Sequence, residues 1–205
     1  AETIALVALE QHQLSALMRA RLWTVCGLSW HYRHDQNAAL IRFDKALAAA
    51  IEAENPAFTA ASLHNRAMVW EHTNQVPQML VDTEEALRLY AEVGIVRHYA
   101  STLTKKARIL HELGQYERAE ECFYESRKLL LQSDASSFLV TCEAHLSNLY
   151  LDWQPSNGSI LALKHAELAL RAARPIGGSK LFMSLNQYSR AETFQGNARR
   201  GLELA

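Results

Sequence analysis

Residues 107–123 read ARILHELGQYERAEECF, and this stretch decides the fold. A helix-like run that starts at Ala107 is interrupted at Leu113-Gly114, resumes at Tyr116 and closes with Phe123. A glycine that follows a run of good helix formers typically ends a helix. The stretch therefore predicts two helices joined by a short turn, and a structural origin for the pattern requires that it recur along the chain.

The pattern recurs with a period of 40 residues. A small residue with a large residue three positions later is found at Gly27 and Trp30, Ala67 and Trp70, Ala107 and Leu110, and Ser147 and Tyr150. The second helix repeats as Ala39–Phe43–Ala46, Met79–Thr83–Ala86, Ala119–Phe123–Ser126 and Ala162–Ala166–Ala169. The last copy comes three residues late, because the segment WQPSNGSI at 153–160 lengthens a turn.

Helix packing gives this spacing a physical reason. A small residue where two antiparallel helices cross allows their backbones to approach, and large residues one turn away fill the space between neighbouring pairs. A larger residue at the small position should therefore clash. One such pair cannot bury its apolar faces alone, so identical pairs stack, and stacking requires a fixed sequence period.

The signals for helix ends agree with an all-α fold. Asn55 before Pro56 predicts a capped helix start, Pro77 fits an opening turn, and Gly94 and Gly114 suit left-handed helix ends. No segment alternates apolar and polar residues long enough for a sheet. We predict helices near 1–13, 15–34, 36–54, 57–73, 77–93, 96–113, 116–133, 136–153, 159–174, 179–195 and 197–205.

Composition excludes several classes of protein. The 21 basic and 22 acidic residues leave a formal charge of −1, which gives no global field for nucleic acid or anionic membranes. Three cysteines without a CxxC pair suit a reducing compartment, and no run is long and apolar enough for a membrane span. We expect a cytoplasmic protein. Because the chain lacks an initiator Met and stops inside a helical pattern, we expect a fragment of a longer protein.

The chain resembles the tetratricopeptide repeat family. The third repeat fits that pattern best, through Leu103, Ala107, Leu110, Gly114, Tyr116, Ala119 and Phe123, whereas His34 and Gln36 replace the glycine and tyrosine in the first repeat. The resemblance implies one all-α domain over 1–205, a right-handed superhelix of stacked antiparallel helix pairs. Its repeats would span about 16–55, 56–95, 96–135 and 136–177, with partial repeats at 1–14 and 178–205. Repeats of 40 residues are similar to the sensor regions of bacterial signal-responsive transcription activators, to peptide receptors of Gram-positive signalling and to some eukaryotic adaptors.

In this family the first helix of each pair lines a concave groove, and the resemblance therefore implies a set of inward-facing residues. The predicted peptide- or partner-binding residues are Arg21, His64, Asn65, Lys105, Arg108, His111, His145 and Asn148. The asparagine amides would bond a peptide backbone, and Lys105 and Arg108 would meet a carboxylate. The alternative is that these are solvated helix residues. A full carboxylate clamp like that of chaperone-binding relatives is not expected, because Thr24 and Leu28 stand where a lysine and an asparagine are needed.

Catalytic and metal-binding signals are missing from the sequence. It contains no GxSxG, GxxxxGK[ST] or GxGxxG motif, and no histidine pair with compact ligand spacing and a third partner. We therefore expect no enzyme, no cofactor and no metal. Trp153, at the start of the lengthened turn, is interpreted as a cap on the core.

The prediction is a non-catalytic protein- or peptide-binding module, the signal- or partner-sensing part of a larger bacterial transcription or signalling regulator. A general scaffold subunit and a domain that senses a small-molecule inducer remain alternatives. The expected partner is a protein or peptide segment, with no membrane contact and no direct binding of nucleic acid. Exposed end helices leave oligomerisation open.

Overall fold

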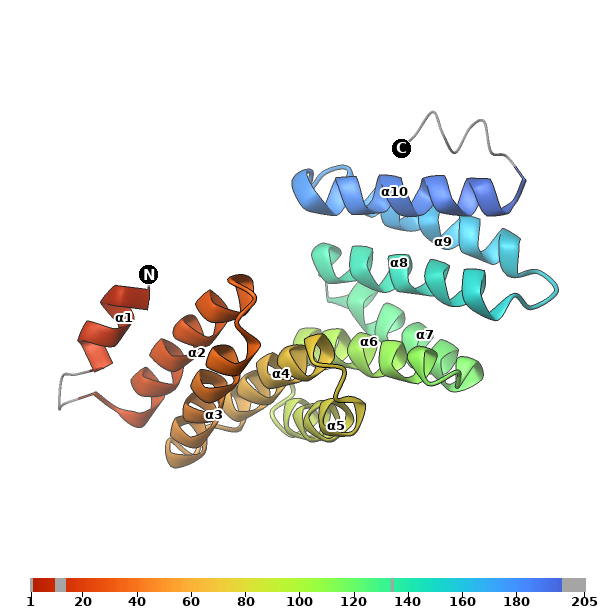
Figure 1. Cartoon of the computed structure of the whole chain (residues 1–205). Coiled ribbons are helices and arrows are strands. Elements are labelled where there is room, and N and C mark those ends of the chain that lie inside the picture. Colours follow the sequence, from red (N-terminus) through yellow and green to blue (C-terminus); the bar gives the residue numbers. More distant parts are fainter. Residues whose placement is uncertain (1, 10–13, 134, 197–205) are drawn as a thin grey trace. The chain divides into compact units, whose positions relative to one another are not determined.

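A computed structural model describes residues 2–9, 14–133 and 135–196, so the predicted helix at 197–205 and the last part, 10–13, of the predicted helix at 1–13 lie outside the described residues. The described residues form helices and no strand, which confirms the all-α prediction. The helices are α1 (Glu2–Leu9), α2 (Ala16–Tyr32), α3 (Gln36–Glu52), α4 (Pro56–His72), α5 (Val76–Glu92), α6 (Val96–Glu112), α7 (Tyr116–Gln132), α8 (Ser136–Trp153), α9 (Gly158–Ala173) and α10 (Gly178–Phe194) (Figure 1). The ends of α2 to α10 lie within two residues of their predicted positions.

The five turns between α2 and α7 follow one geometry. Left-handed backbone conformations occur at His34 (φ 64°), Glu54 (φ 47°), Asn74 (φ 54°), Gly94 (φ 70°) and Gly114 (φ 72°). After each of them a backbone N–H bonds the carbonyl five residues earlier, as from Gln115 to Leu110 at 2.9 Å. This is the hydrogen bond of a Schellman helix end. The predicted left-handed glycines are confirmed, and His34 shows that the same turn forms where the glycine is replaced.

The predicted cap at Asn55 is also present. Asn55 Oδ1 accepts a hydrogen bond from the backbone N–H of Phe58 at 3.1 Å, and Pro56 opens α4. The missing N–H of proline costs nothing in the first turn, where no intrahelical acceptor is available. Pro77 likewise lies in the first turn of α5.

The helices group into two compact units, Ala1–Ile95 and Val96–Ala205. In unit 1, α2 and α4 contact each other, α3 packs against both, α5 packs against α4 and α1 packs against α2. The crossing of α2 and α3 brings Gly27 against the buried Phe43, where an added Cβ would lie 2.5 Å from the ring atom Cε1. The predicted role of the small residue is thus borne out at Gly27.

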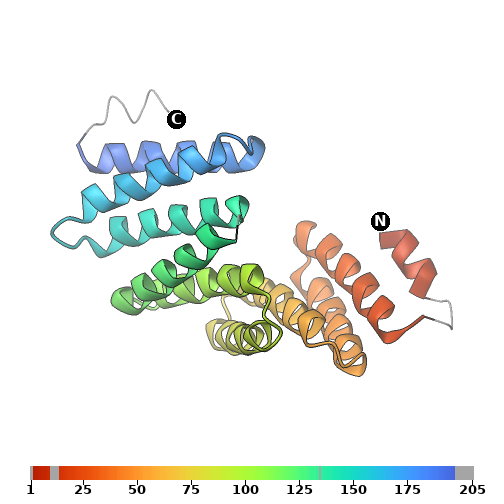
Figure 2. The ribbon, with the colours of Figure 1, turned by 180° about the vertical axis from the view of Figure 1, so that it is seen from behind.

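In unit 2, α8 contacts α6, α7, α9 and α10, and it forms one layer with α6 and α10 (Figures 1 and 2). The other layer holds α7 and α9. Ala107, Phe123, Leu146, Leu149 and Tyr150 form the centre of a continuous apolar core. Trp153 packs on the edge of this core, stacked on Tyr150 and Tyr116 with ring centroids 6.4 and 6.0 Å away, as its interpretation as a cap requires. That the repeats form one domain stays a prediction.

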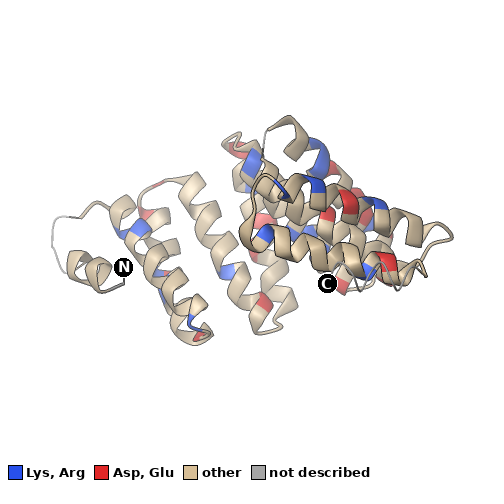
Figure 3. Cartoon of the chain, turned by 90° about the horizontal axis from the view of Figure 1, so that it is seen from above, with Lys and Arg blue, Asp and Glu red and all other residues tan. Residues whose placement is uncertain are grey.

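Basic and acidic residues are interspersed along the helices (Figure 3). None of the helices in the described part of the chain is both long enough and apolar enough to cross a membrane.

Candidate functional site

The first helices of the pairs in unit 2 present a polar stripe, which we call the A-helix face. On α6 the stripe contains Lys105, Arg108 and His111, and on α8 it contains His145 and Asn148. Residues three or four apart share one side of a helix, so each set lies in a row. Five of the eight predicted binding residues therefore lie on neighbouring helices of one unit.

Hydrogen bonds and an ion pair join the stripes of successive first helices. His111 Nε2 lies 3.0 Å from Asp152 Oδ2, between α6 and α8. From α10, Arg190 Nη1 donates to Asn148 Oδ1 at 3.0 Å, and Lys180 Nζ donates to Thr141 Oγ1 at 2.6 Å. Each contact links residues about one repeat apart, so the face is a polar surface that runs over three helices.

Basic side chains outnumber acidic ones on this face. The face carries four basic residues, Lys105, Arg108, Lys180 and Arg190, and two acidic residues, Glu112 and Asp152. Lys180 is half-buried, and this burial lowers the pKa of its ammonium. An anionic group is therefore favoured over a cationic one at this surface.

A cavity of about 410 Å³ lies between α8 and α10. Its wall includes the Asp152 carboxylate, the Arg190 guanidinium and the Phe194 ring. It adjoins the polar stripe, because Asp152 and Arg190 belong to both. The face thus offers a recess lined by two apolar residues, two charged residues and two residues with hydroxyl groups.

The other three predicted residues belong to unit 1. Arg21, on α2, is exposed and its guanidinium carbon lies 5.0 Å from the centre of the Phe58 ring on α4, a cation–π distance. His64 and Asn65 lie partly buried on α4. The structure brings these residues onto two neighbouring helices, and their role in binding a partner stays a prediction.

Two features of unit 2 were missed by the sequence analysis. Arg190 and Lys180 were not chosen because α10 was treated as a partial repeat, although a shift of 42 residues from Asn148 leads directly to Arg190. The second feature is a buried polar network around Glu143. The sequence signal for this network was Glu143 itself, a charged residue at the repeat position where the other repeats have Trp23, Leu63 and Leu103.

The Glu143 network joins three helices. Glu143 is 2% exposed, and its carboxylate accepts from Arg127 Nε at 2.6 Å and lies 2.7 Å from His165 Nδ1. His165 Nε2 lies 3.1 Å from the Tyr124 hydroxyl, which lies 3.1 Å from the Tyr150 hydroxyl. Because a buried carboxylate needs such partners, this network is a structural tie between α7, α8 and α9.

Among the described residues no group of three or more His, Cys, Asp or Glu side chains could hold a metal ion. The three cysteines are free thiols, with Cys26 and Cys142 buried and Cys122 half-buried. Burial raises the pKa of the Cys142 thiol to about 12. These thiols therefore belong to the packing of the helices.

Comparison with solved structures places this geometry among known folds. The Rap protein in complex with competence and sporulation factor superposes with a TM-score of 0.81 at 13% identity, covering 94% of this chain and 53% of Rap. Nearly identical TPR-like repeats from Podosopora anserina superpose with a TM-score of 0.71 at 16% identity, covering 94% of this chain and 93% of that one. This chain has a tetratricopeptide-like repeat fold.

A third tetratricopeptide-like structure is NprR in complex with its cognate peptide NprX, with a TM-score of 0.73 and 14% identity. The alignment covers 94% of this chain and 55% of NprR, so the chain spans about half the length of the Rap and NprR proteins. No family model and no curated protein sequence matches the chain.

Proposed function

We propose that the chain is a non-catalytic peptide-binding module whose A-helix face in unit 2 holds an extended or helical segment with an acidic group. The observation that carries the proposal is the continuous polar stripe over α6, α8 and α10, in which cations exceed anions. Lys105 and Arg108 would pair with the carboxylate of the segment. The Asn148 amide accepts from Arg190 through Oδ1, and its NH₂ group would donate to the peptide backbone.

The fold supports this use of the surface, since NprR, a protein with the same fold, was solved with its cognate peptide. We infer that His111 and His145 belong to the same site, and Arg21, His64 and Asn65 stay predicted partner-binding residues of unit 1. The proposed setting is the signal- or partner-sensing part of a larger bacterial regulator in the cytoplasm. Three free thiols suit that compartment.

A small-molecule inducer is the second candidate ligand. The cavity of about 410 Å³ between α8 and α10 favours it, because this volume falls within the range of small-molecule sites. Thermal stabilisation of the chain by metabolites, with no stabilisation by peptides, would select this alternative.

The test is a selection from a random-peptide display library, followed by affinity measurements on an enriched peptide by fluorescence anisotropy. The variant Lys105→Glu/Arg108→Glu should weaken binding at least about tenfold, because each charge-assisted hydrogen bond contributes about 1.5–3 kcal/mol. The matched control is Lys128→Glu/Lys164→Glu, which makes the same charge change at exposed residues of α7 and α9. Equal loss of affinity in both variants would refute the A-helix face as the site.

A further inference from the structure

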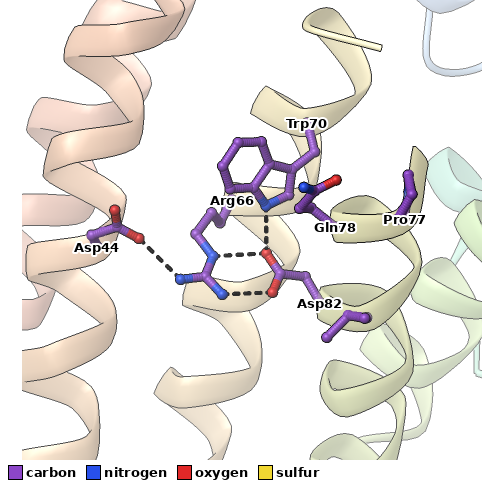
Figure 4. A pocket seen from close by; sticks show the side chains of 7 residues that line it. Asp44, Arg66, Trp70, Pro77, Gln78 and Asp82 are labelled. Carbon is purple, nitrogen blue, oxygen red and sulfur yellow. Dashed lines mark hydrogen bonds and ion pairs between the residues drawn. The ribbon is translucent and has the colours of Figure 1, made fainter. Parts of the chain in front are cut away.

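A second cavity lies in unit 1, between α3 and α5 and over α4, with a volume of about 390 Å³ (Figure 4). Asp44 lines it from α3, Arg66 and Trp70 from α4, and Val81 and Asp82 from α5. The second helices α3 and α5 form its two sides, and side chains of the first helix α4 form its floor. It is separate from the A-helix face of unit 2.

The walls of the cavity carry one excess negative charge. Arg66 donates from Nε to Asp82 Oδ2 at 2.7 Å, from Nη2 to Asp82 Oδ1 at 2.6 Å and from Nη1 to Asp44 Oδ1 at 2.9 Å. The hydrogen bonds to Asp82 raise the pKa of Arg66, so its guanidinium stays charged beside the two carboxylates. Trp70 Nε1 also donates to Asp82 Oδ2, at 2.9 Å.

The two carboxylates differ in how many of their hydrogen-bond acceptor sites remain open to a ligand. Asp82 is only 3% exposed, and Arg66 and Trp70 already donate three hydrogen bonds to it. The side chain of Asp44 is 52% exposed, and among the described residues its carboxylate forms a hydrogen bond and ion pair with Arg66 alone, through Oδ1. Asp44 Oδ2 is therefore the acceptor available to a ligand at the mouth of the cavity (Figure 4).

Unit 2 provides an internal comparison. The repeat spacing aligns Asp44, Trp70 and Asp82 with Tyr124, Tyr150 and His165. In unit 2 the Tyr124 hydroxyl lies 3.1 Å from both the Tyr150 hydroxyl and His165 Nε2. In unit 2 these side chains therefore fill the space between the second helices of successive repeats. In unit 1 the equivalent space holds a cavity.

Apolar residues flank the acidic cavity. Pro77 and Val81 of α5 both line it and are both exposed, Val81 to 66%. The residue of α7 that is equivalent to Val81 is the charged Glu121. Exposed apolar side chains beside a charged group offer a partner apolar surface to bury next to an ion pair.

We propose that this cavity docks the lysine or arginine side chain of a partner protein segment whose neighbouring apolar residues pack on Pro77 and Val81. The cation would pair with Asp44 Oδ2 and neutralise the excess charge. These two apolar residues give a peptide segment an advantage over a free cationic metabolite, which has no apolar neighbours to bury. The A-helix face would take an acidic segment and this cavity a basic one, so the two sites select different partners.

The experiment is an NMR titration that follows the indole N–H signal of Trp70, assigned by its loss in Trp70→Phe. The probes are acetyl-Leu-Arg-Leu-amide, the same tripeptide with neutral citrulline in place of arginine, and N-acetylargininamide. The arginine tripeptide should shift the signal in a saturable way and bind at least about tenfold more tightly than the citrulline tripeptide, because the charge-assisted hydrogen bond is lost. It should also bind more tightly than N-acetylargininamide.

Variants locate the contact. Asp44→Asn should weaken the arginine tripeptide about tenfold, whereas Glu84→Gln, the same charge change at an exposed residue of α5 outside the cavity, should leave binding unchanged. Val81→Ser should weaken the tripeptide and leave N-acetylargininamide unaffected. Equal binding of the arginine and citrulline tripeptides, equal binding of the tripeptide and N-acetylargininamide, or unchanged affinity in Asp44→Asn would overturn the proposal. If Asp44→Asn loses the folded spectrum, the citrulline comparison on the unaltered chain decides.

Discussion

Replacing Gly27 by alanine should destabilise the chain, although alanine is the better helix former. A Cβ at this position would lie 2.5 Å from Phe43 Cε1, about 1 Å closer than an ordinary carbon–carbon contact. Helix propensity favours alanine by about 1 kcal/mol, and overpacking costs about 1–3 kcal/mol. The cost belongs to the upper part of that range, because the Phe43 ring is fully buried and cannot swing into solvent. The expected net loss is about 1–2 kcal/mol.

Urea denaturation followed by circular dichroism measures this loss. Ala48→Gly, at an exposed position of α3, calibrates the propensity difference in the same chain and should cost about 1 kcal/mol. Phe43→Leu should cost less in the Gly27→Ala background than in the original chain, because the smaller side chain makes room for the new methyl group. A Gly27→Ala variant that is more stable by about the amount that Ala48→Gly loses would refute the proposed close crossing of α2 and α3.

Three further outcomes are expected. Glu143→Leu should cost about 3–5 kcal/mol in urea denaturation, because it leaves Arg127 and the buried imidazole of the network without their carboxylate, and a loss below about 1 kcal/mol would contradict this. The Cys142 thiol should react with Ellman's reagent only after unfolding, because burial raises its pKa to about 12. The half-buried Cys122 should react slowly in the native chain, and equal reaction rates of the two thiols in the native chain would be contrary evidence. An acidic peptide on the A-helix face should bind more tightly at about pH 5.5 than at about pH 7.5 in anisotropy measurements, because imidazoles gain charge; equal or reversed affinities would count against a role for the histidines.

The repeat architecture could be predicted from the sequence because local signals repeat in register. The 40-residue recurrence of small residues such as Gly27 and Ala107 reflects a packing requirement at every helix crossing. The left-handed turn at Gly114 was readable from its glycine, but the same turn at His34 carries no such signal. It follows from the spacing of the repeats, which places His34 where the chain must reverse.

The polar clusters were less predictable, because their members are separated in sequence and each taken alone resembles a surface residue. Arg66 meets Asp44 and Asp82, which lie 22 and 16 residues away on two different helices. Arg190 lies 42 residues after Asn148, a separation that differs from the 40-residue period because the turn at 153–160 is lengthened. A fixed period identifies equivalent positions, but it does not say which neighbouring side chains bond to each other.

Photo-crosslinking tests the central claim most directly, by locating a library-selected peptide on the chain. Benzoylphenylalanine introduced at position 145 of α8, on the A-helix face, should crosslink the peptide, and unlabelled peptide should compete with the reaction. The same group introduced at position 128 of α7, on the other layer of unit 2, should give no specific product. Crosslinking from position 128 but not from position 145 would show that the peptide binds elsewhere and would contradict the account.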